Sequence, residues 1–191
     1  MPRVARTVIL VAIAVAIVAL PAGCGSSAIA PSPSTTTASV ATTEGTSATD
    51  AAAAKAIQAM ADYTSALKKW FHDFSTGLAD EMTKAFDFRD PSKPTDSELL
   101  RAHQFTDLMR MSVTKLAEIS APPKVANAHA QLYSALRGEV DALERYVNAV
   151  DWGSARDAEL AMRGAKEAYT LYAQAVQGLS PYVDLAGMTQ D

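Results

Sequence analysis

The sequence is poor in the residues that build most metal, haem and disulfide sites. Among its 191 residues are one cysteine, Cys24, and three histidines, His72, His103 and His129. A single cysteine cannot form an intramolecular disulfide, a cysteine-rich zinc site or the Cys-x-x-Cys-His attachment of a c-type haem. No histidine follows a glutamate by three residues and no two histidines share helical spacing, which argues against di-iron carboxylate and zinc-helix motifs.

Motifs for nucleophilic catalysis and phosphate binding are also lacking. The chain has no Gly-x-Ser-x-Gly elbow and no glycine-rich phosphate loop. We therefore expect no catalytic residue, no metal site and no cofactor, and an enzyme with a dispersed carboxylate site is the alternative. The carboxylates have the spacing of solvated helix faces, among them Glu139, Asp141, Glu144, Asp157 and Glu159.

The chain begins with a basic segment and a purely apolar run. Arg3 and Arg6 precede thirteen apolar residues, from Val8 to Leu20. A transmembrane helix needs about 20 apolar residues, whereas a core of about 7–15 behind positive charge is typical of a secretory signal. This layout predicts export across a membrane.

The single cysteine follows the run in the stretch Leu20-Pro21-Ala22-Gly23-Cys24. The stretch resembles the lipobox of bacterial lipoproteins, in which a leucine and two small residues precede the lipidated cysteine. The resemblance implies cleavage of residues 1–23 between Gly23 and Cys24, with acyl chains such as palmitate carried on Cys24. Pro21 departs from the pattern, because the lipobox expects leucine there. The alternative is an ordinary signal that releases a soluble, secreted helical protein.

Residues 24–49 have the composition of a disordered linker. From residue 25 to residue 49, thirteen of twenty-five residues are Ser or Thr, and Glu44 is the only charged one. Such a segment buries too little apolar surface to offset the entropy of ordering. Lipobox, Ser/Thr-rich stalk and alanine-rich remainder together look like lipoproteins of actinobacterial cell envelopes. That resemblance implies a lipid anchor on the outer face of the cell membrane and no particular activity.

Residues 50–191 contain all thirteen aromatic residues and suit a single domain. Apolar residues recur there at spacings of three and four, which predicts amphipathic helices. Asp50 is the expected N-cap of the first helix. The apolar stripe predicted for this helix is Ile57, Met60, Thr64, Leu67, Phe71, Phe74, Leu78, Met82 and Phe86.

Strong end signals separate the later helices. Pro91 and Pro94 break the first helix, and Thr95-x-x-Glu98 is a capping box for the second. Pro122 and Pro123 are expected to open the third helix, and Ser154-x-x-Asp157 to cap the fourth. The predicted stripes are Ala102, Phe105, Met109, Ser112, Leu116 and Ile119; Val125, His129, Leu132, Leu136, Val140, Leu143, Val147 and Val150; and Ala158, Met162, Ala165, Tyr169, Tyr172, Val176 and Leu179.

Four amphipathic helices with short connections predict an all-α fold, an antiparallel up-down-up-down four-helix bundle. Removal of the leader takes Arg3 and Arg6 from 17 basic residues and leaves 21 acidic ones, a net charge of −6. This charge argues against nucleic acid as a partner. His129 lies on an apolar stripe, where it is a metal-ligand candidate or, as we expect, a packing residue.

Two places are candidate partner contacts. One is the basic-aromatic cluster Lys68-Lys69-Trp70, and the other is Trp152 in a short turn. In the alternative interpretation Trp70 and Trp152 border the core and the lysines are solvated. We expect a lipid-anchored, non-catalytic binding or scaffolding module whose partner is an unknown envelope protein. The alternative is a carrier of an apolar ligand, which would need an internal apolar pocket of about 300 Å³ or more.

Overall fold

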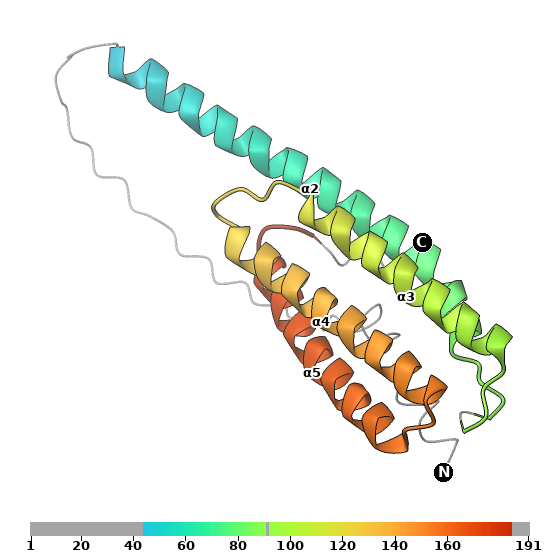
Figure 1. Cartoon of the computed structure of the whole chain (residues 1–191). Coiled ribbons are helices and arrows are strands. Elements are labelled where there is room, and N and C mark those ends of the chain that lie inside the picture. Colours follow the sequence, from blue (N-terminus) through green and yellow to red (C-terminus); the bar gives the residue numbers. More distant parts are fainter. Residues whose placement is uncertain (1–43, 91, 185–191) are drawn as a thin grey trace.

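The computed structural model describes residues 44–90 and 92–184, which form four helices and no strand (Figure 1). The helices are α2 (Glu44–Ala85), α3 (Asp96–Ala117), α4 (Ala126–Asp151) and α5 (Ala155–Leu179). Successive helices run in opposite directions, so the predicted all-α, up-down-up-down architecture is confirmed. The predicted cleavage site at Gly23 and the lipidation site at Cys24 lie outside the described residues.

The bundle consists of two antiparallel helix pairs. Helix α2 packs against α3 and α4 packs along α5, and the contact between α3 and α4 joins the two pairs. The close approach of α4 and α5 depends on small residues, because Gly138 lies against Ala168 and Gly164 against Ala142. The largest fully buried aliphatic side chains come from all four helices and include Leu67, Met109, Leu116, Leu132, Leu136 and Leu179.

Two helix starts follow the sequence signals. The Thr95 hydroxyl accepts a hydrogen bond from the Glu98 amide, and the Glu98 carboxylate accepts one from the Thr95 amide at 2.8 Å. The Glu98 carboxylate also accepts the Arg89 amide at 2.9 Å, and these hydrogen bonds lower the pKa of its carboxyl to about 2. The Ser154 hydroxyl caps α5 by accepting from the Asp157 amide.

The predicted opening of α4 at the prolines is wrong. Pro122 and Pro123 are the first two residues of a turn in which the Val125 amide donates to the Pro122 carbonyl at 3.0 Å. Helix α4 begins after this turn, at Ala126. Its predicted stripe from Val125 to Val150 is buried throughout.

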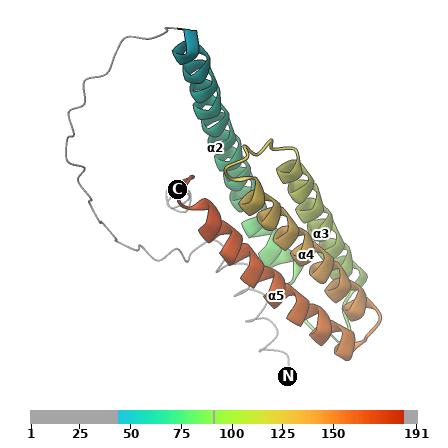
Figure 2. The same ribbon diagram turned by 90° about the vertical axis from the view of Figure 1, so that its left-hand side faces the viewer.

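Helix α2 differs most from the expectation, because Asp50 lies inside the helix and is not its N-cap. The linker expected to end at residue 49 therefore overlaps α2 over residues 44–49, and the alanines that favour helix follow from Ala51 to Ala54. Every residue from 48 to 59 is exposed, and this part of α2 projects beyond the other three helices (Figure 2). Ile57, predicted to be buried, is consequently 71% exposed.

Candidate functional site

The basic-aromatic cluster on α2 does not form one surface. Trp70 is 5% exposed, stacks on Phe74 at 4.8 Å between ring centroids and donates Nε1–H to the Ser112 carbonyl of α3 at 2.8 Å. The indole therefore fixes α3 on α2 and is not available to a partner. Lys68 is exposed, and the exposed Lys69 forms an ion pair with Asp73 at 2.7 Å.

Trp152 lies in the turn between α4 and α5 and is 76% exposed, the largest exposure among the bulky apolar side chains described. The turn is a Schellman motif, in which the Ser154 amide donates to the Ala149 carbonyl and the Gly153 amide to the Val150 carbonyl. Gly153 has a φ of 68°, which the motif requires of this position. The structure thus presents an exposed indole on a well-anchored turn.

His129 connects three helices through polar contacts. Its Nδ1 atom lies 3.2 Å from the Tyr63 hydroxyl of α2, and its ring also forms a hydrogen bond with the Leu116 backbone of α3. Burial lowers the pKa of His129, against the effect of the Leu116 hydrogen bond, and burial raises the pKa of Tyr63 to about 12. The ring is therefore neutral at pH 7 and acts as a polar link within the core.

Glu139 is a buried carboxylate that the sequence analysis placed wrongly on a solvated face. Only 5% of the residue is exposed, and burial raises the pKa of its carboxyl from the ordinary 4.5 to about 7. The negative charge of Glu139 contributes to the raised pKa of Tyr172 on α5, after burial as the main cause. The sequence contains a signal for this burial, because Glu139 continues the steps of four and three from Leu132 through Leu136.

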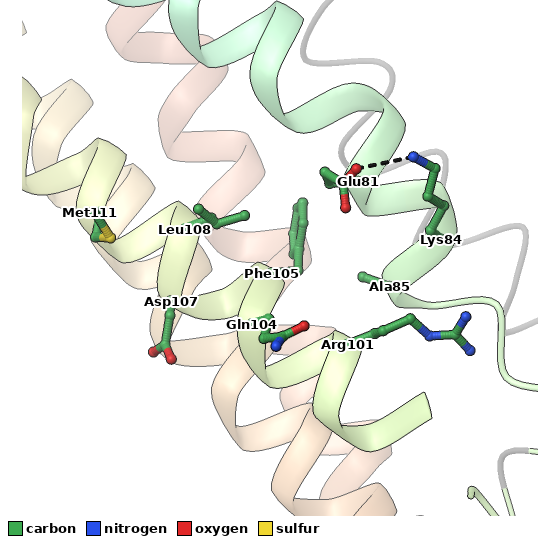
Figure 3. A pocket seen from close by; sticks show the side chains of 9 residues that line it. All are labelled: Glu81, Lys84, Ala85, Arg101, Gln104, Phe105, Asp107, Leu108 and Met111. Carbon is green, nitrogen blue, oxygen red and sulfur yellow. Dashed lines mark hydrogen bonds and ion pairs between the residues drawn. The ribbon is translucent and has the colours of Figure 1, made fainter. Parts of the chain in front are cut away.

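A groove of about 460 Å³ lies between α2 and α3, on the outside of the bundle (Figure 3). Phe105 stands between the two helices, and Ala85 and Leu108 flank it. Charged side chains line the rest, among them Arg101 and an ion pair at 3.0 Å between Glu81 and Lys84. The groove is thus an open, mixed surface and not the internal apolar pocket that a carrier needs.

The three histidines lie apart, His72 on α2, His103 on α3 and His129 on α4. Within residues 44–90 and 92–184 no group of three or more His, Cys, Asp or Glu side chains could hold a metal ion. In the same residues no helix is long and apolar enough to span a membrane.

Comparisons with known proteins add no assignment. No protein-family model matches the chain, and no significant similarity to a curated protein or to a solved structure was found.

Proposed function

We propose that this chain is a lipid-anchored envelope protein that acts as a non-catalytic binding module. Export and anchoring are supported by the apolar leader and the lipobox-like stretch that ends at Cys24. A diacylglyceryl group would insert two acyl chains, which is the number that stable anchoring generally requires. The attached bundle would then stand at the outer face of the membrane.

Trp152 is the observation that carries the binding role. Tryptophan is enriched among the residues that dominate the energy of protein interfaces. Exposure of a large apolar ring to water is unfavourable for the isolated protein, and burial of the ring against a partner would be favourable. The Schellman turn holds the backbone at Trp152 in place before binding, so little backbone entropy is lost on association.

The arrangement of the helices separates the proposed anchor from the proposed contact. Helix α2 enters the bundle from its projecting N-terminal end, and the turn at Trp152 lies at the opposite end, beside the loop between α2 and α3 (Figures 1 and 2). A chain tethered upstream of α2 would present Trp152 away from its tether. This polarity suits a partner in the envelope better than contact with the anchoring membrane itself.

The direct test is photo-crosslinking in intact cells with a photoreactive phenylalanine analogue at position 152. We expect one dominant adduct with another envelope protein. In a second experiment without the photoreactive analogue, the Trp152→Ala variant should recover less of that protein than the wild type does. Leu171 on α5 is 53% exposed and provides the matched control position. Equal adduct formation at 152 and 171, or none at 152, would contradict the assignment.

A further inference from the structure

The outer face of α3 carries large apolar side chains that nothing in the described structure covers. Leu100, Leu108 and Met111 are 58%, 44% and 59% exposed. With Gln104 they follow one another at spacings of four, four and three, so they form one stripe along the helix. We call these four residues the α3 outer stripe. It lies next to the groove between α2 and α3, which Leu108 and Met111 also line.

The stripe differs from the other apolar positions on the surface. Leu160 and Leu171 on α5 are separated by the same eleven residues as Leu100 and Met111, but Gly164 and Glu167 stand between them. Helix α5 therefore has two isolated leucines, whereas on α3 Leu108 and Met111 are neighbours along the helix and Leu100 lies two turns before Leu108, beyond Gln104. Scattered apolar residues need no explanation, whereas neighbouring exposed apolar residues beside a hollow indicate an interaction surface.

We propose that the α3 outer stripe is a self-association surface, which pairs antiparallel with the same stripe of a second copy of the chain. Such an interface is isologous, because each copy contributes the same residues. When the two α3 helices cross at a midpoint between Phe105 and Thr106 of each copy, Leu100 of each copy lies opposite Met111 of the other. The groove gives side chains of the second copy a hollow to enter, as knobs enter holes between paired helices.

Charge supports a second copy as the occupant. In the same register Asp96 of one copy lies opposite Lys115 of the other, near both ends of the paired helices. Both side chains are exposed and neither forms an ion pair within the described residues, although the charge of Lys115 also acts on Asp73 of α2. Opposite charges at both ends favour the antiparallel register over a parallel pairing, which would place each charge beside its own kind. The same register places Arg101 opposite Arg110, whose charge is already paired with Asp107 and Glu144. This surface is independent of Trp152 and of the anchor.

Sedimentation velocity tests the proposal on the chain from residue 24 onward, with Cys24→Ser so that neither lipid nor a disulfide links two copies. We expect a concentration-dependent dimer. Leu108→Glu should raise its dissociation constant about 30-fold or more, equivalent to about 2 kcal/mol. Leu171→Glu, a substitution of an exposed leucine on α5, should leave the constant unchanged. A chain that stays monomeric, or a dimer that tolerates Leu108→Glu, would overturn the proposal.

The register has its own test in the full-length chain. Lys115→Glu should weaken the dimer, and adding Asp96→Lys should restore it. The pair Leu100→Cys and Met111→Cys should yield a disulfide-linked dimer after export, whereas Leu160→Cys with Leu171→Cys should not. Crosslinking by the α5 pair but not by the α3 pair would place the interface on α5 and refute the assignment to α3.

Discussion

At the scale of single residues, the buried polar side chains of α4 make the fold sensitive to pH. The pKa of Glu139 is raised from 4.5 to about 7, so the folded chain holds this proton more tightly than the unfolded chain does. The contribution of Glu139 therefore stabilises the fold as the pH falls through 7 and is complete below about 4.5, whereas the lowered pKa of His129 acts in the opposite direction. Glu139→Gln removes the cost of the charge and should raise the free energy of unfolding at pH 8, by up to about 3 kcal/mol.

The comparison is made by chemical denaturation at pH 8 and at pH 5. The advantage of Glu139→Gln over the wild type should be largest at pH 8 and should shrink at pH 5, where the buried carboxyl is already protonated. Glu167→Gln, an exposed substitution on α5, serves as the control and should show no such trend. An equal difference at both pH values would mean that the Glu139 carboxyl does not titrate in this range.

A substitution of Tyr63 tests the hydrogen bond to His129, the second buried polar side chain of α4. Tyr63→Phe keeps the ring but leaves Nδ1 of His129 without its hydroxyl partner. A buried acceptor left unsatisfied costs about 1–3 kcal/mol, so the free energy of unfolding should fall by that amount in urea titrations. Tyr133→Phe, which alters a half-buried tyrosine on α4, should change it by less than about 0.5 kcal/mol. Equal effects of the two substitutions would argue against a role for the hydrogen bond.

At the scale of the helices, the sequence predicts ends that local chemistry determines and misses those that depend on context. The caps at Thr95 and Ser154 were predictable because each needs only a hydroxyl and an amide three residues later. The start of α2 was not, because the Ser/Thr-rich composition before Asp50 favoured a linker and the alanines that favour helix begin only at Ala51. The start of α4 was missed because prolines are compatible with both a turn and a first helical turn.

The burial of particular side chains required the tertiary structure. Trp70 continues the spacing of α2, yet its burial depends on the Ser112 carbonyl of a neighbouring helix. Glu139 also has core spacing, but its charge favoured a solvated position. Trp152 was a candidate contact with a position at the border of the core as the alternative, and only the structure shows that its ring is exposed. Ile57 has core spacing but is exposed, because α3 and α5 are too short to extend the core to this part of α2.

Two glycines offer a sharp test of the turn between α4 and α5. A Cβ atom added at Gly77 or at Gly153 would meet no atom within 4 Å beyond the adjacent residues and, for Gly77, the backbone of its own helix, so backbone conformation is what distinguishes the two sites. Gly153→Ala should destabilise the protein by about 1–2 kcal/mol because its φ is 68°. Gly77→Ala, inside α2, should stabilise it by about 0.5–1 kcal/mol. Thermal unfolding should show shifts of opposite sign, and shifts of the same sign would contradict the Schellman assignment.

Leu136 tests the packing of the central helix. The side chain is 1% exposed and belongs to the stripe of α4 that is buried throughout. Leu136→Ala should lower the free energy of unfolding by about 2–5 kcal/mol. Asp141→Ala on the exposed face of the same helix should stay within about 0.5 kcal/mol. A loss below 1 kcal/mol for Leu136→Ala would mean that the four helices do not share a close-packed core.

At the scale of the whole molecule, different parts of the bundle have different proposed roles. The projecting start of α2 leads toward the proposed anchor, the turn at Trp152 offers a contact at the far end, and the α3 outer stripe offers a lateral contact with a second copy. A dimer formed through α3 would present two copies of Trp152, which would strengthen binding to a partner with two sites.

The anchored role depends on the claim that Cys24 carries a lipid. The most direct measurement is the intact mass of the protein extracted in detergent from its native membrane, together with its partition into the detergent phase. We expect a chain that begins at Cys24 with the added mass of a diacylglyceryl group, and Cys24→Ala should release the protein or leave an uncleaved precursor. A wild-type chain without added lipid mass, or unchanged mass and partition in Cys24→Ala, would contradict it.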